Sequence, residues 1–249
     1  MVRKYLRNRP KTWTARLTKR SPVSDKPHYT GHRQRLRQRL LQSGAEALPD
    51  YELLELVLFS ALPRQDTKPL AKQLIDTFGS FAEVVAAEPN ALKKVPGVGD
   101  AVIATLKTVQ GASQRLAQQH ILDKPVLSNW QALLDYLRIS MAFGMTEQFR
   151  VLFLNKKNIL IADEVQQKGT VDHTPVYPRE IIKRALEVGA TAIIMVHNHP
   201  SGDPEPSDAD IQMTLEVRAA GEKMGIVLHD HVVIARDGAK SFKSLGLLR

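Results

Sequence analysis

The chain contains no cysteine among its 249 residues, and this absence removes two kinds of chemistry. Neither a disulfide bond nor a thiolate ligand can form, so any bound metal must be held by histidine and carboxylate side chains. A cysteine-free chain also fits a reducing compartment, and we expect the protein to reside in the cytoplasm.

Long apolar runs are missing as well. No segment approaches the ~20 apolar residues that a membrane-spanning helix needs, so we expect no membrane partner. The basic N-terminus lacks the apolar stretch of a secretory signal. Aromatic residues make up only 6% of the chain, and Trp13 and Tyr29 are too few to indicate base stacking near the N-terminus. The 43% of hydrophobic and 24% of charged residues are typical of a globular protein.

Acidic residues are nearly absent from the first forty positions. Residues 1–40 carry 13 Lys and Arg against one acid, Asp25, whereas the remaining residues carry 22 basic and 25 acidic side chains. The surplus behind the net charge of +9 therefore lies in this segment. Such an arm attracts polyanions such as DNA. It is equally typical of a disordered solubilising tail, and for residues 1–27 both interpretations stay open.

A change of pattern near residue 121 divides the sequence in two. Residues 28–120 have helical periodicity, residues 121–127 resemble a linker, and residues 128–249 alternate strand-like apolar runs with helical segments. This order predicts a small all-α domain followed by an α/β domain, of the α+β type with a mixed sheet. The predicted strands are 148–154, 158–165, 190–196 and 226–235, and the predicted helices between or before them are 129–143, 179–188 and 208–224.

Helix boundaries follow from capping residues and from the spacing of leucines. Ser128 is predicted to cap the helix over 129–143, and Pro178 to occupy the first position of the next helix. In the first domain, a helix over 31–41 would turn Leu36, Leu40 and Leu41 inward and its arginines outward.

A glycine-bearing hairpin lies between two predicted helical segments of the first domain. One or two helical turns over 89–95 are followed by Pro96-Gly97-Val98-Gly99 and a helix over 100–119. The run LKKVPGVGDAVIATLK resembles the helix-hairpin-helix family, in which hairpin amides bind a DNA phosphate.

This resemblance makes Gly97 and Gly99 candidate phosphate-binding positions, with Lys93 and Lys94 adding positive charge. Asp100 departs from the pattern, because a cation would favour binding more at that position. A helical packing module can use the same hairpin without binding DNA, and this alternative stays open.

The segment from His197 to Asp210 carries the strongest chemical signal in the sequence. His197 and His199 follow a predicted buried strand and, two residues apart, point to the same side of it. If Ser207 caps the following helix, Asp210 lies on the same face one turn later. Two neutral imidazoles and a carboxylate form the ligand set of a catalytic zinc site. A His-x-His pair alone occurs often by chance, so the prediction depends on the whole four-residue pattern and its context.

His-x-His-Pro followed by Ser-x-x-Asp is similar to the signature of the JAMM (MPN-plus) zinc metallopeptidases. The wider layout resembles the bacterial RadC family, in which a helical region with a helix-hairpin-helix precedes a JAMM-like domain. The resemblance covers about residues 28–249, and its most specific segments are VYPREIIKRALE and HNHPSGDPEPSDAD.

The resemblance implies one Zn2+ per chain, bound by His197, His199 and Asp210. A water would complete the site, its pKa lowered towards about 7 by the metal. Ser207 would hydrogen-bond the oxyanion of a tetrahedral intermediate. The substrate would be a protein or a peptide.

The resemblance also implies an upstream glutamate that takes a proton from the water and passes it to the leaving amine. The family pattern places this residue at the start of the strand that follows the first helix of the domain. Glu147 matches that position, and Glu164, near the end of the next strand, is the alternative. The commoner fate of either carboxylate would be a solvent-facing position at a strand end.

A second His-x-His pair lies in the last long strand. His229 and His231 share one face of that strand, but no carboxylate follows them at ligand spacing. We expect ordinary strand histidines or partners of the metal ligands rather than a second metal site. His173 is expected in an exposed loop.

Three functions are consistent with these features. The first is a zinc-dependent hydrolase that cleaves a peptide or isopeptide bond. The second is a DNA-binding or DNA-repair-associated protein with a mainly structural metal domain, as the label of the family and the basic arm suggest. The third, a metal-dependent nuclease, is disfavoured because the sequence lacks a second carboxylate cluster for a two-metal site.

Overall fold

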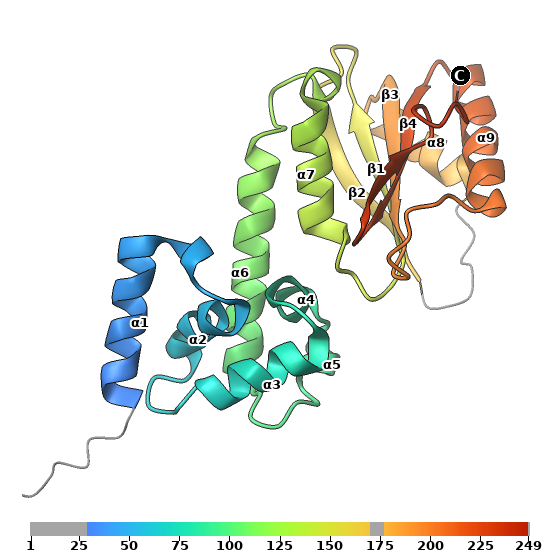
Figure 1. Cartoon of the computed structure of the whole chain (residues 1–249). Coiled ribbons are helices and arrows are strands. Elements are labelled where there is room, and N and C mark those ends of the chain that lie inside the picture. Colours follow the sequence, from blue (N-terminus) through green and yellow to red (C-terminus); the bar gives the residue numbers. More distant parts are fainter. Residues whose placement is uncertain (1–28, 170–176, 249) are drawn as a thin grey trace, which may run out of the picture.

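The structure is a computed structural model that describes residues 29–169 and 177–248, with a helical region followed by a five-stranded sheet (Figure 1). The predicted arm over 1–27 and His173 lie outside the described residues. None of the described helices combines the length and the apolar character that crossing a membrane requires.

The helical region contains six α-helices within the described residues. They are α1 (Tyr29–Ser43), α2 (Asp50–Ala61), α3 (Lys68–Phe78), α4 (Phe81–Ala86), α5 (Pro89–Leu92) and α6 (Asp100–Gln119). A core that includes Leu54, Leu74 and Leu106 joins α2, α3 and α6. Leu36 of α1 is buried as predicted, but Leu41 is 84% exposed, so the prediction that it faces inward is wrong.

The sheet is mixed, as the sequence predicts. It consists of β1 (Gln148–Leu154), β2 (Leu160–Lys168), β3 (Ala192–Asn198), β4 (Val227–Ala235) and β5 (Gly238–Ser241) in the order β2-β1-β3-β4-β5. Only β3 and β4 are parallel. Helix α7 (Trp130–Met141) covers one face, and α8 (Pro178–Glu187) and α9 (Asp208–Lys223) cover the other (Figure 1).

The sheet domain has one helix start that agrees with the sequence at Pro178 and one that differs at Ser128. Pro178 occupies the first turn of α8, as predicted. Ser128 does not cap α7, because a short 3-10 helix (Val126–Asn129) comes first and the Ser128 hydroxyl donates to the Pro125 carbonyl at 2.7 Å. Such local side-chain bonds compete with capping.

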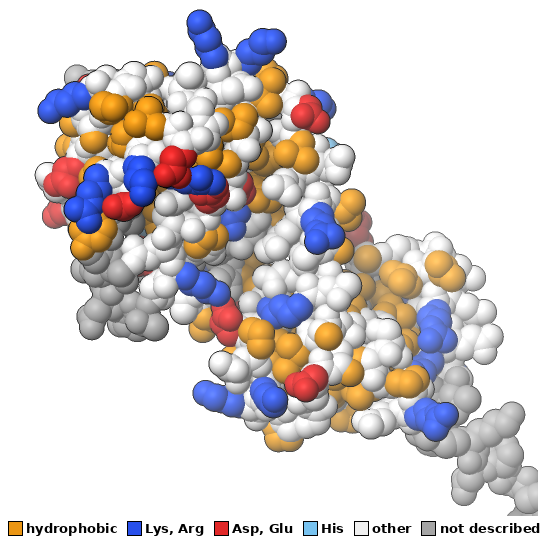
Figure 2. Space-filling model, turned by 180° about the vertical axis from the view of Figure 1, so that it is seen from behind, with side chains coloured by type: hydrophobic (Ala, Val, Ile, Leu, Met, Phe, Trp, Pro, Cys, Tyr) orange, Lys and Arg blue, Asp and Glu red, His pale blue; other side chains and the backbone are white. Residues whose placement is uncertain are grey.

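Two ion pairs join the helical region to the sheet, in addition to the packing of α6 against α7. Glu83 of α4 lies 2.6 Å from Arg236, and Glu88, just before α5, lies 2.8 Å from Lys168. Such partly exposed pairs contribute little free energy. On the face seen in Figure 2, blue Lys and Arg side chains are interspersed with red Asp and Glu side chains over the sheet domain.

Candidate metal centre

Three potential metal ligands converge where β3 ends and α9 begins. His197 is the second-to-last residue of β3, and His199 follows β3 directly. Asp210 lies in the first turn of α9. One ligand atom of each lies within 4.8 Å of the other two, and among the residues that the structure describes this is the only such group of three. The sequence therefore predicted which side chains the fold brings together here.

Hydrogen bonds of the strand ladder hold the two histidines. His197 pairs with Phe149 of β1 and with Val233 of β4, and its side chain is 1% exposed. The backbone N–H of His199 donates to the Ile234 carbonyl at 2.9 Å, which extends the ladder one residue beyond β3. The loop then turns at Gly202, whose φ of 100° favours glycine.

A capping box fixes the carboxylate. The Ser207 side chain accepts from the backbone N–H of Asp210, and the Asp210 carboxylate accepts from the Ser207 N–H at 2.8 Å, so Ser207 caps α9 as predicted. The Ser207 hydroxyl also donates to Asp210 Oδ2 at 2.6 Å. These bonds hold Asp210 with its other oxygen, Oδ1, 3.3 Å from His197 Nε2. Ser207 itself is exposed.

The distances within the cluster fit a tetrahedral metal ion. His197 Nε2 and His199 Nε2 lie 2.9 Å apart, and Asp210 oxygens lie 3.3 and 3.6 Å from these two nitrogens. Zinc–nitrogen bonds of about 2.0–2.1 Å would separate neighbouring tetrahedral ligand atoms by roughly 3.3 Å. Two imidazole lone pairs this close repel each other unless a cation or a proton lies between them. The donor set therefore fits a bound divalent metal.

The ring of His199 presents Nε2 to the cluster because its other nitrogen is occupied. His199 Nδ1 lies 2.9 Å from the Asp203 carbonyl, which only accepts, so Nδ1 carries the hydrogen. The adjacent Asp210 carboxylate is the main cause that raises the pKa of His199, and burial opposes it. Burial works against ionisation of Asp210, but the adjacent imidazoles of His197 and His199 hold the pKa of this carboxyl well below its usual range.

Glu147 and Glu164 lie in different surroundings. Glu147 is exposed just before β1, and continuing the antiparallel register past Phe149 and His197 places it opposite His199. Its charge is the smallest of the causes that raise the pKa of His199, after the Asp210 carboxylate and the Asp203 carbonyl. Glu164 lies on β2, separated from β3 by β1, and accepts two hydrogen bonds from Arg184 Nε and one from Nη2, at 2.7 to 3.1 Å. Of these two glutamates, Glu164 is engaged by Arg184 and Glu147 is the one placed at the cluster end of β1.

A buried asparagine between the two histidines was missed by the sequence reasoning. Alternation turns Asn198 to the opposite face of β3, where its side chain accepts from Gln148 N–H at 2.8 Å. Its amide donates to the carbonyls of Thr146 at 3.2 Å and Gly144 at 3.5 Å. Asn198 thereby fixes the segment that carries Glu147. Alternation alone shows which face it occupies, but its partners lie about fifty residues away in the sequence.

We expect the Asn198→Ala variant to lose about 2–3 kcal/mol of unfolding free energy, at about 1 kcal/mol per hydrogen bond, while it keeps its metal stoichiometry. The amide of Gln148 should also exchange faster with deuterium. Urea unfolding, exchange and metal analysis measure these quantities. Asn129→Ala is the control, since its side chain makes one exposed bond to the His120 carbonyl. Unchanged stability and exchange in Asn198→Ala would show that this side chain does not hold the segment.

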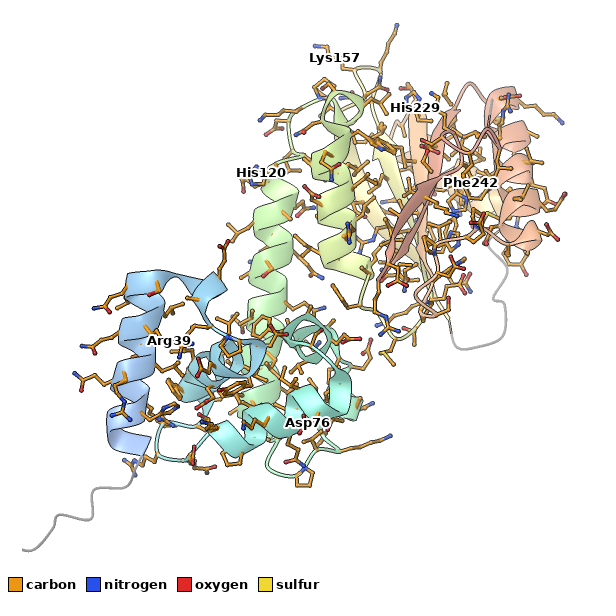
Figure 3. The ribbon with its side chains drawn as sticks, viewed as in Figure 1. Arg39, Asp76, His120, Lys157, His229 and Phe242 are labelled. Carbon is orange, nitrogen blue, oxygen red and sulfur yellow. The ribbon has the colours of Figure 1, made fainter. Side chains whose placement is uncertain are left out.

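The remaining strand histidines separate into two roles. His231 Nε2 lies 2.7 Å from His197 Nδ1, so His231 is a partner of a candidate ligand, one of the alternatives predicted. His229 lies near the start of β4, close to the tip of the β1–β2 hairpin that carries Lys157 (Figure 3), and hydrogen-bonds Asn158 at 2.7 Å. Neither forms a second metal site within the described part of the chain.

The hairpin has the outline that the sequence predicts. Helix α5 is followed by Gly97, with φ of 87°, and by Gly99 at the N-cap of α6. Lys93 and Lys94 are exposed, and Lys93 Nζ lies 3.5 Å from the Asp100 carboxylate, which offsets its charge. DNA binding at the hairpin stays a prediction.

The fold and the cluster define a JAB-type domain. Residues 127–247 match the family model of the RadC-like JAB domain, and residues 29–104 match that of the UPF0758 N-terminal domain. The chain belongs to the UPF0758 family of RadC-like proteins, which confirms the resemblance drawn from its motifs.

Two relatives illustrate how far the similarity extends. A UPF0758 protein of Rhodobacter capsulatus is 63% identical over 213 residues, which are 86% of this chain and 100% of the relative. A UPF0758 protein of Ruegeria pomeroyi is 56% identical over 217 residues, or 87% of this chain and 97% of the relative. The similarity therefore spans both the helical region and the sheet.

Proposed function

We propose that this protein is a zinc-dependent hydrolase that cleaves a peptide or isopeptide bond in a protein or peptide substrate. The observation that carries the proposal is the convergence of His197, His199 and Asp210, with partly exposed His199 and Asp210 side chains and Glu147 opposite. A ligand set with an open side suits catalysis, whereas a structural zinc is enclosed by four protein ligands.

Each residue of the site has one role in this proposal. His197, His199 and Asp210 hold the metal, which when bound acts as a Lewis acid and brings the pKa of a water towards neutrality. Glu147 takes a proton from the attacking water and delivers it to the leaving amine. The exposed Ser207 hydroxyl, which donates its single hydrogen to Asp210 Oδ2 in this structure, turns that hydrogen to the substrate oxygen as negative charge develops there.

The choice of zinc rests on the chemistry of the donors. Imidazole nitrogens with a single carboxylate favour zinc, whereas magnesium and calcium favour oxygen ligands only. We place this activity in the cytoplasm, because the chain has no cysteine and therefore none of the disulfides that secreted proteins commonly carry.

Cleavage assays test the proposal. Zinc-loaded protein is incubated with peptide and isopeptide libraries, and mass spectrometry identifies the products. We expect cleavage by the wild type and none by His197→Ala, because this change removes a buried ligand. If the wild type cleaves nothing above the level of His197→Ala, the hydrolase proposal is wrong and a binding role is favoured instead.

A further inference from the structure

His197 has an unusual hydrogen-bond partner for a metal ligand. Ligand histidines commonly donate their second ring N–H to a carboxylate or a backbone carbonyl, which can only accept. His199 follows this pattern, with Nδ1 2.9 Å from the Asp203 carbonyl. His197 Nδ1 instead lies 2.7 Å from the ring nitrogen Nε2 of His231. Because an imidazole nitrogen can either donate or accept, this contact alone does not determine which nitrogen of His197 carries the hydrogen.

The direction of the bond is determined one residue farther along, at Thr214 of α9. The Thr214 hydroxyl lies 2.5 Å from the Asp210 carbonyl oxygen and 2.6 Å from His231 Nδ1. The carbonyl only accepts, so the hydroxyl donates its single hydrogen there. The hydroxyl oxygen must then accept from His231, whose Nδ1 therefore carries a hydrogen.

The surroundings of His231 favour a neutral ring. The side chain is fully buried, stacked on Phe242 with ring centroids 4.5 Å apart, and Phe149 meets its edge at 5.9 Å. Figure 3 shows Phe242 between the sheet and α9. No carboxylate among the described residues hydrogen-bonds this ring, so the free-energy cost of burying a charge there outweighs the attraction of the Asp210 carboxylate.

We propose that Thr214 and His231 are positioning residues that set the tautomer of His197. With its hydrogen on Nδ1, neutral His231 accepts at Nε2, so His197 donates from Nδ1 and turns the lone pair of Nε2 towards His199 and Asp210. The chain of bonds begins at the His197 ring and ends at the backbone carbonyl of Asp210. It therefore links β3, which carries His197, to α9, which carries Asp210. The inference rests on the proposed metal site but does not require hydrolysis.

Zinc affinity in the full-length protein tests this role. Thr214→Val keeps the size of the side chain but removes the hydroxyl, so His231 is free to place its hydrogen on Nε2. His197 would then accept at Nδ1 and carry its hydrogen on Nε2, where it blocks the metal. We expect the zinc dissociation constant to rise about 10- to 100-fold, the range for loss of an outer-shell partner. Thr214→Ser, which keeps the hydroxyl, should restore it to within about threefold of the wild type, well below that range.

Thr108→Val is the matched control. The Thr108 hydroxyl donates to the Ala104 carbonyl at 2.8 Å, the same bond from residue i to i−4, but on the exposed side of α6. It should leave zinc affinity unchanged. Equal affinities of folded Thr214→Val and wild type would overturn the inference.

A second measurement needs no metal. Nitrogen-15 NMR of the metal-free protein reports which nitrogen of His231 carries the hydrogen. We expect Nδ1–H in the wild type and in Thr214→Ser, and a shift towards Nε2–H in Thr214→Val. Nε2–H in the wild type would overturn the inference even if zinc binds. Conversely, a wild type that binds no zinc but shows Nδ1–H contradicts the proposed function alone.

Discussion

The wild type is expected to bind one zinc per chain, and the His199→Ala variant is expected to lose it. Removing His199 leaves two donors, and His197 is then the only nitrogen ligand in the cluster. The loss in affinity should exceed the roughly 100-fold that removal of an outer-shell partner costs at most, since a direct ligand is removed. The His199 side chain is 19% exposed, so the substitution leaves the buried core intact.

Metal analysis after gel filtration and competition with a chelator measure the effect. Ligand linkage gives an independent readout, because zinc at 1,000 times its dissociation constant stabilises the folded state by about 4 kcal/mol. The wild type should show this stabilisation and His199→Ala should not. His120→Ala is the control, since His120 is exposed at the end of α6, far from the site (Figure 3). Equal zinc content in all three proteins would remove His199 from the ligand set.

The metal cluster could be predicted from the sequence because its geometry is local. His197 and His199 are two residues apart on a strand, and Ser207 and Asp210 are one helical turn apart, so secondary structure alone sets their directions. The apolar run before the histidines fixes the strand, and the capping box fixes the start of α9. Only the approach of β3 to α9 depends on the tertiary fold.

The residues that support the cluster could not be predicted in the same way. Asn198 bonds to Gln148 across 50 residues of sequence, and His197 bonds to His231, which the sequence offered only as one alternative, across 34. No periodicity encodes such contacts, because they depend on the order of strands in the sheet. The predicted cap at Ser128 is wrong for a different, local reason. The Ser128 hydroxyl donates to the nearby Pro125 carbonyl and does not cap the helix. The prediction for Leu41 is wrong because only part of the leucine-bearing side of α1 is buried, and Leu41 lies outside that part.

Replacing Glu147 by Gln is expected to lower the rate of hydrolysis about 10²- to 10⁴-fold, the usual contribution of a general base, with zinc content unchanged. The amide keeps the shape of the side chain but cannot take a proton from water. Glu147 lies opposite His199 in the continued register of β1 and β3, and its backbone carbonyl accepts from Gly169 N–H at 3.0 Å. The carboxylate can therefore be changed without disturbing the strand.

Glu164→Gln separates the two candidates for the base. Its carboxylate is engaged by Arg184, and the hydrogen bonds from this guanidinium are the main cause that lowers the pKa of Glu164. A carboxylate held in this way is a poor proton acceptor, so Glu164→Gln should weaken the β2–α8 contact and leave the rate per folded molecule unchanged. Rates are compared on the substrate found for the wild type, with folded fractions taken from thermal unfolding. A loss of activity in Glu164→Gln, with Glu147→Gln unaffected, would reverse the assignment. A loss in neither would require that a group other than these two glutamates accept the proton from the attacking water.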